Sequence, residues 1–134
     1  MNLSTFLNPI AVESKKVVIS KRFVENGMPV EWEIKAISAE QDAALRKMCT
    51  RKEKKNANLI TLDVELYVAK LMAASVVYPD VQNVELQNAY HVMNGEDLLQ
   101  KMLTSGEYAH LGEQVKQVND FDKDLEELVD EAKN

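Results

Sequence analysis

The chain has 134 residues, of which 46% are hydrophobic and 28% charged, and this balance is typical of one soluble globular domain. Its formal net charge of −6 and pI of about 5.0 argue against nucleic acid as the main partner, because phosphate backbones attract basic surfaces. The single cysteine, Cys49, excludes an internal disulfide and a metal site built from several cysteines, and it is typical of a reducing compartment.

No part of the sequence resembles a targeting or membrane segment. The N-terminus has neither a basic start nor a long apolar run. The most apolar stretch, residues 62–78, contains Asp63, Glu65 and Lys70 and falls short of the ~20 apolar residues that a membrane span needs. We therefore expect a cytoplasmic protein with no membrane partner.

Residues 1–15 are predicted to form an extended N-terminal arm, ahead of a single α+β domain over residues 16–134. The arm has no clear period. Two interpretations remain open: the arm packs on its own domain, or it grips a neighbouring subunit of a homo-oligomer. The apolar residues available for self-association are Leu3, Phe6, Leu7, Ile10 and Val12.

Alternating apolar residues predict a β-hairpin with strands at about 16–24 and 30–37. Asn26 and Gly27 favour a type I′ turn, since both central residues of that turn need positive φ. This turn predicts the facing pairs Phe23–Val30, Ile19–Ile34, Val17–Ala36, Arg22–Glu31 and Lys21–Trp32. Because an isolated hairpin is marginal in water, we expect cover from helices or a further strand from the arm or a second subunit.

A bundle of about six helices is predicted to follow, so the fold class is α+β, mostly α. Ser38 and Gln41 form a capping box before a first helix that should bury Ala44, Leu45, Met48 and Cys49. Thr61 should cap a central helix, apolar nearly all round, that runs to about Tyr78 and ends at Pro79. Shorter helices are expected at about 83–93, 95–103, 106–118 and 122–132.

The bend at residues 75–90, SVVYPDVQNVELQNAY, gathers polar and aromatic side chains as a ligand pocket does. We interpret it as a corner between two helices, with Asn83 as the cap of the second.

We find no candidate catalytic, cofactor-binding or metal-binding residues. His91 and His110 lie in no nucleophile or metal motif, and Cys49 near a helix end is interpreted as a core residue. Glu96 and Asp97 are acids of a first helical turn, where the helix dipole favours them. The protein is therefore predicted to be neither an enzyme nor a cofactor carrier.

One basic cluster interrupts the acidic chain and is interpreted as a solvated loop, with an acidic partner surface as the alternative. Its members are Arg46, Lys47, Arg51, Lys52, Lys54 and Lys55. Residues 120–134 are such an acidic surface, with seven acids against two lysines and a net charge of −5.

An amphipathic stripe runs through the C-terminal third at helical spacing. It is formed by Leu111, Val115, Val118, Phe121, Leu125, Leu128 and Ala132, with Val129 beside it. The stripe either belongs to the domain's own core or binds a partner helix.

Several stretches, in collinear order over nearly the whole chain, resemble the XkdN-like family of phage tail assembly chaperones. They are FLNP (6–9), ISKRF (19–23), PVEW (29–32), LRKMCT (45–50), VVYPD (76–80), ELQNAY (85–90), LLQKMLTSGEY (98–108) and FDKDLEELVDEAKN (121–134). Two positions depart from the family pattern: His91 and Asp120 stand where a glycine is expected.

The resemblance implies a protein of the bacterial host cytoplasm that binds the tape measure protein and keeps it soluble during tail assembly. The tail tube protein is a possible second partner. The alternative is a small structural tail or connector protein that stays in the virion.

Overall fold

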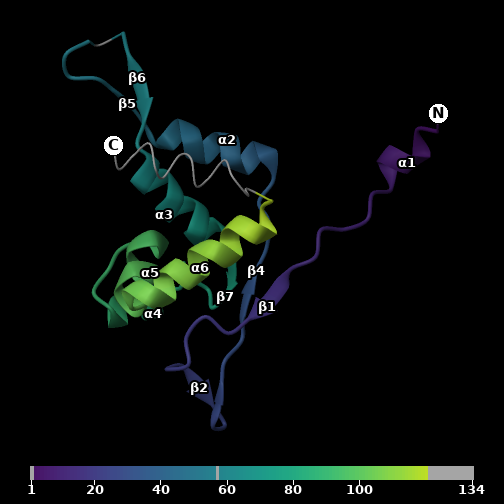
Figure 1. Ribbon diagram of the computed structural model, residues 1–134, viewed down its shortest axis with the longest axis vertical. Coiled ribbons are helices and arrows are strands. Elements are labelled where there is room, and N and C mark those ends of the chain that lie inside the picture. The colour runs from purple at the N-terminus through teal and green to yellow at the C-terminus, as the bar shows by residue number, and fades with distance from the viewer. Residues whose placement is uncertain (1, 57, 121–134) are drawn as a thin grey trace.

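The structure is a computed structural model, and it describes residues 2–56 and 58–120 (Figure 1). Its helices are α1 (Ser4–Leu7), α2 (Ala39–Met48), α3 (Val64–Ser75), α4 (Val84–Ala89), α5 (Gly95–Met102) and α6 (Ser105–Val118). Its strands are β1 (Lys15–Val17), β2 (Val24–Glu25), β3 (Met28–Pro29), β4 (Trp32–Ile34), β5 (Thr50–Lys52), β6 (Ile60–Leu62) and β7 (Val76–Tyr78). The predicted α+β class with mostly helix is confirmed.

Helix α3 is the centre of the domain, as predicted, and α2, α5 and α6 pack around it (Figure 1). Its buried residues include Tyr67, Leu71 and Met72. The helix begins after Asp63, whose side chain accepts a hydrogen bond from the Leu66 amide at 3.2 Å, so the predicted cap at Thr61 is wrong.

Strand β7 supplies the third strand that the hairpin needs. We expected α3 to continue to Tyr78, but it ends at Ser75, and the next three residues pair with β4 in a sheet of order β1-β4-β7. Two valines and a tyrosine before a proline favour extended backbone over helix, which explains the early end. The sheet is therefore completed within one chain.

The predicted turn is confirmed, but the register at the base of the hairpin is wrong. Asn26 and Gly27 have φ values of 53° and 78°, and the Val30 amide donates to the Phe23 carbonyl at 2.8 Å. Further from the turn, however, Val17 lies opposite Trp32 and not opposite Ala36. The β1–β4 pairing therefore does not continue the register that the turn sets.

The residues between the two registers explain the shift. Ile19 is only 4% exposed and Ser20 only 2%, so this part of the chain turns into the core and does not continue the strand. The predicted pairs Ile19–Ile34, Lys21–Trp32 and Arg22–Glu31 are consequently absent from the pairing of β1 with β4. The partner of Val17 moves from Ala36 to Trp32, which is an even shift, so Trp32 (1% exposed) and Ile34 (0%) keep the buried face that the alternation predicted.

Helix α2 begins as predicted but does not bury the residues we expected. The capping box is present: the Gln41 amide donates to the Ser38 hydroxyl at 3.1 Å, and the Ser38 amide to the Gln41 side chain at 2.8 Å. However, Ala44 and Met48 are exposed and Leu45 is half-buried; of the four expected core residues, only Cys49, at the C-cap, is buried.

A polar network joins α2 to α3, beside Leu45, which packs partly buried against the core. The buried Tyr67 donates its hydroxyl hydrogen to Asp42, and the Arg46 guanidinium stacks 4.5 Å from the Tyr67 ring while also bonding Asp42. Burial and the hydrogen bond to Asp42 both raise the pKa of Tyr67, so the phenol stays protonated. This network fixes one face of α2 and leaves the other open to solvent.

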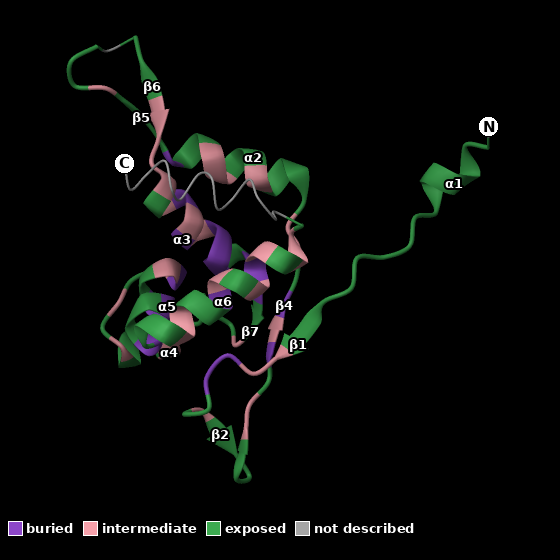
Figure 2. Ribbon diagram, in the orientation of Figure 1, coloured by how far each residue is buried: buried purple, intermediate pink, exposed green. Residues whose placement is uncertain are grey.

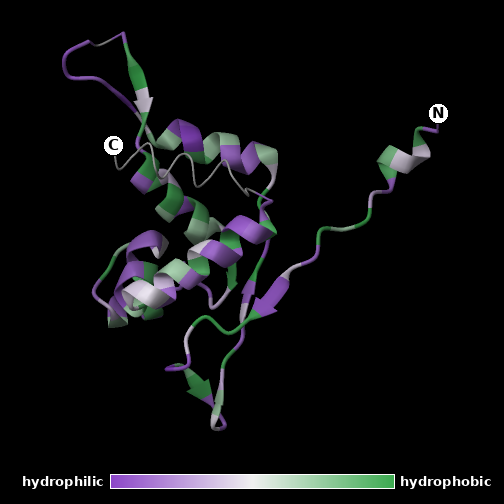
Figure 3. Ribbon diagram, viewed as in Figure 1, coloured by the Kyte–Doolittle hydropathy of each residue, from purple (hydrophilic) through white to green (hydrophobic). Residues whose placement is uncertain are grey.

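The basic loop after α2 is a β-hairpin. Strands β5 and β6 pair as Thr50–Leu62, Arg51–Thr61 and Lys52–Ile60, and they project from the domain with a hydrophilic tip (Figures 1 and 3). The predicted solvated character holds, but the regular strand pairing was not anticipated.

The last three described helices lie close to their predicted positions, each with a polar cap. Asn83, Asn94 and Thr104 accept hydrogen bonds from the amides of Leu86, Asp97 and Glu107. The predicted helix at 122–132 lies outside the described residues. Among the described helices, none has the length and apolarity to cross a bilayer.

The two departures from the family pattern both occur at left-handed backbone positions, with φ of 59° at His91 and 58° at Asp120. Left-handed geometry costs a non-glycine residue about 1–2 kcal/mol. Glycine avoids this cost but loses roughly 0.5–1 kcal/mol in conformational entropy on folding.

We therefore expect His91→Gly to raise the free energy of unfolding by up to about 1 kcal/mol, measured by urea denaturation. His110→Gly, on an exposed turn inside α6, is the matched control and should lower it by about 0.5–1 kcal/mol. Equal effects at both sites would contradict this account.

Candidate functional site

The N-terminal arm exposes every apolar residue that we assigned to self-association. Their exposed fractions range from 61% to 95% (Leu3 70%, Phe6 73%, Leu7 68%, Ile10 95%, Val12 61%). The arm extends away from the domain, and one short helical turn, α1, interrupts its extended course (Figures 1 and 2). Of the two interpretations, packing on its own domain is not what the structure shows.

The described part of the C-terminal stripe belongs to the domain core. Leu111 and Val115 are fully buried, and Val118 packs partly buried against the same cluster. Of the two alternatives, burial in the chain's own core therefore holds for these residues. Phe121, Leu125, Leu128 and Val129 lie outside the described residues, and their binding to a partner remains a prediction. The last residue of the arm, Lys15, donates a hydrogen bond to Gln117 on α6 at 3.4 Å, whereas α1 lies far from α6 (Figure 1).

An ion-pair network that the sequence did not predict holds α6 against the loop after β1. Arg22 donates to Glu107 through Nε at 3.1 Å and to the Met102 carbonyl at 2.8 Å, while the Ser20 hydroxyl donates to Glu107 at 2.6 Å. The hydrogen bonds from Arg22, Ser20 and the Thr104 amide hold the pKa of the Glu107 carboxyl far below its usual range.

The depressed pKa of Glu107 makes a pH-dependent contribution to stability. The unfolded chain takes up a proton at the ordinary glutamate pKa of about 4.3, whereas the folded chain resists protonation to much lower pH. The stabilisation by ionised Glu107 is thus complete above the pKa of the unfolded state, and it is lost as the pH falls from there toward the pKa of the folded state. We expect the difference in unfolding free energy between wild type and Glu107→Gln to be largest near pH 7 and smaller near about pH 3. A constant difference, or one unaffected by adding Arg22→Gln, would refute this role.

Asn119, which the sequence analysis missed, fastens the end of α6. Its side-chain oxygen accepts from the Ile37 amide at 3.0 Å, and its side-chain nitrogen donates to the Ser75 hydroxyl at 3.1 Å and the Val115 carbonyl at 2.9 Å. One residue therefore connects the end of α6 to the end of α3 and to the segment that precedes α2. Asn119 thus fixes the position of the last turn of α6.

Cys49 is buried in the core and Glu96 pairs with a lysine, so both residues have structural roles. Burial raises the pKa of the Cys49 thiol, which makes it a poor nucleophile. Glu96 forms an ion pair with Lys70 at 2.8 Å between α5 and α3; although burial opposes it, this hydrogen bond lowers the pKa of Glu96. Within residues 2–56 and 58–120, no three or more His, Cys, Asp or Glu side chains are grouped to hold a metal ion.

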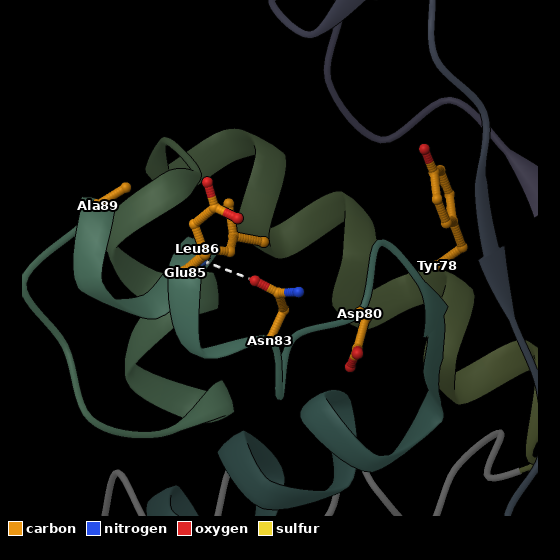
Figure 4. A pocket seen from close by; sticks show the side chains of 6 residues that line it. All are labelled: Tyr78, Asp80, Asn83, Glu85, Leu86 and Ala89. Atoms are coloured by element: carbon orange, nitrogen blue, oxygen red, sulfur yellow. Dashed lines mark hydrogen bonds between the residues drawn. The ribbon is translucent and has the colours of Figure 1, made fainter.

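The corner at residues 75–90 contains an open cavity of about 470 Å³ (Figure 4). Its lining residues are Tyr78, Asp80, Asn83, Glu85, Leu86 and Ala89. Two of its polar side chains are used locally: Asn83 accepts from the Leu86 amide at 2.9 Å and Asp80 from the Gln82 amide at 3.0 Å. The predicted cap at Asn83 is confirmed, and the cavity is a shallow surface feature beside it.

The geometry defines a small helical protein that exposes an apolar arm and a basic hairpin. Comparison with known proteins gives its class: the model of the phage XkdN-like tail assembly chaperone proteins matches residues 3–133. The chain belongs to this family.

Two relatives from Bacillus subtilis strain 168 match over almost their whole length. The phage-like element PBSX protein XkdN is 33% identical, with 99% of this chain and 94% of the relative covered. The protein YqbN is 34% identical, with 99% and 93% covered. The crystal structure of YqbN superimposes with a TM-score of 0.77 at 28% identity, over 89% of this chain and 96% of that one.

Proposed function

We propose that this protein is a non-catalytic tail assembly chaperone that binds the tape measure protein and keeps it soluble in the cytoplasm of the bacterial host. The family assignment supports the general role. The observation that carries the proposed mode of action is the arm, where five apolar side chains are 61–95% exposed. Several large apolar side chains exposed on one segment are typical of a surface that another molecule covers.

A long helical protein with apolar stripes is a suitable partner for such a surface. An apolar segment of the chaperone covers part of a stripe, while the net charge of −6 keeps the complex soluble. Many copies bound along one target would hold it through avidity, so each single contact can stay weak and reversible.

Affinity co-purification tests this binding directly. The tagged tape measure protein of the same genome is expected to retain the wild-type chain and to lose it when Phe6 and Ile10 are both replaced by aspartate. The matched control replaces exposed Val84 and Met93, far along the chain from the arm, in the same way. Equal retention of wild type and arm variant would exclude the arm as the binding segment.

Mass spectrometry of purified particles separates a chaperone from a structural tail or connector protein. A chaperone leaves before maturation, so we expect the chain in assembly intermediates and not in mature virions. A stoichiometric amount in mature virions would favour the structural alternative.

A further inference from the structure

Helix α2 and the β5–β6 hairpin together form an uncovered surface that is both apolar and basic. We call it the α2–hairpin surface. Its exposed apolar residues are Met48 (60% exposed), Leu59 (52%) and Ile60 (62%), with Ala44 also exposed. Its exposed basic residues are Lys47, Arg51, Lys52, Lys54 and Lys55, and none of them forms an ion pair with another residue of the described ranges 2–56 and 58–120.

The sequence pattern of α2 indicates that this surface has a partner. Leu45 packs partly buried against the core, but Ala44 and Met48, one helical turn apart, are exposed, and none of the residues of α2 is fully buried. Since the opposite side of α2 is held to α3 by Tyr67 and its polar contacts, the apolar side is free for another segment.

The C-terminal segment, residues 121–134, has the complementary chemistry. It contains six acids and two lysines, a net charge of −4, whereas residues 50–55 contain four basic residues and one acid, a net charge of +3. It also carries four large apolar residues, Phe121, Leu125, Leu128 and Val129. Opposite charge fixes orientation and apolar contact supplies affinity.

The end of α6 lies close to the start of α2. Asn119 bonds the Ile37 amide at 3.0 Å, so the chain leaves α6 next to the start of α2. Helix α2, with 10 residues, is about 15 Å long, and 14 residues in helical form would span about 21 Å. The segment is thus long enough to follow α2 along its whole length and to reach the hairpin.

We propose that residues 121–134 bind back onto the α2–hairpin surface of the same chain. Their apolar side chains cover Ala44 and Met48, and their acidic side chains meet Lys47, Arg51 and Lys52. If the proposed function holds, the apolar stripe of this segment is covered in the free chaperone, and a tape measure helix must displace it to bind there.

A spin label at the chain end tests the docking in the full-length protein without any partner. Asn134→Cys changes no charge, and the buried Cys49 should remain unlabelled in the folded state. We expect the label to broaden the amide signals of Arg51, Lys52 and Ile60 and to spare those of α4. The broadening should disappear at high salt. Absence of broadening at the α2–hairpin surface would overturn the proposal.

Two comparisons decide between possible occupants. In the first, an isotope-enriched chain without a spin label is mixed with a spin-labelled chain that is not isotope-enriched. A contact within one chain then leaves the observed signals sharp. Broadening of the signals of the α2–hairpin surface would assign that surface to a second copy and overturn docking within one chain. The variant Arg51→Glu, Lys52→Glu should lose the contact, whereas Lys101→Glu, an exposed position on α5, should keep it. Broadening that persists in the hairpin variant would refute recognition by charge.

Because the measurement uses the isolated protein, its failure would leave tape measure binding untouched. Conversely, loss of tape measure binding would not remove the intramolecular broadening. The two proposals can therefore fail separately.

Discussion

Leu111→Ala is expected to lower the free energy of unfolding by about 3–5 kcal/mol, the largest effect among the substitutions considered. Leu111 is fully buried in the cluster formed by α3, α5 and α6. The truncation removes its transfer free energy and leaves a cavity that a close-packed core cannot fill. Urea denaturation with a two-state fit measures the loss.

The matched control for Leu111 is Leu7→Ala on the arm. Leu7 is 68% exposed, so the same chemical change should alter stability by less than about 0.5 kcal/mol. If Leu111→Ala left stability unchanged but weakened tape measure binding, the stripe of α6 would be a partner surface and the assignment of Leu111 to the core would be wrong.

Asn119→Ala should lower the free energy of unfolding by about 1–3 kcal/mol. The substitution removes the acceptor of the Ile37 amide and the donor to the Ser75 hydroxyl and the Val115 carbonyl. A partly buried group left without its partner loses its hydrogen bond and stays partly desolvated. Chemical denaturation measures the change.

Two variants sharpen the test at Asn119. Asn119→Asp retains an acceptor for the Ile37 amide and should recover part of the loss. Asn88→Ala, on the exposed side of α4, should change stability by less than about 0.5 kcal/mol. A similar, small effect of both alanine substitutions would show that Asn119 does not fasten α6.

Short sequence motifs predicted the hairpin turn and the helix cap, because each of these features depends only on neighbouring residues. The Asn26–Gly27 turn and the Ser38–Gln41 capping box depend on residues within a few positions of each other, and the structure contains both. The central position of α3 followed from its apolar circumference, which surrounding elements must cover. A further capping box, Thr104 with Glu107, was readable in the sequence and would have placed the start of α6 correctly.

Features that depend on distant parts of the chain were not predicted. The register of β1 against β4 changes because the chain leaves the ladder where Ile19 and Ser20 are buried, and this tertiary effect overrides the turn. The end of α3 was misplaced because an apolar run of valines and tyrosine suits either helix or strand, and only pairing with β4 decides between them. Helix α2 was expected to bury its apolar side, which the described residues leave open.

In the candidate site, too, the sequence predicted some features and missed those that depend on contacts between distant residues. The apolar arm was predicted because its five large apolar residues show no sustained period, although the structure places Phe6 and Leu7 in the short helix α1. The contact between Arg22 and Glu107 joins residues 85 positions apart, and no local pattern indicates it. Likewise, the stripe could not reveal that its first residues, Leu111 and Val115, belong to the core, since core and partner faces share one spacing.

Co-expression measures directly whether this chain keeps the tape measure protein soluble, as we propose. The tape measure reading frame of the same genome is expressed alone, with the wild-type chain, and with the Phe6→Asp, Ile10→Asp variant, and the soluble fraction is quantified. We predict that the wild-type chain moves the tape measure product into the soluble fraction and that the arm variant does not. An unchanged soluble fraction with the wild-type chain would contradict the proposed function.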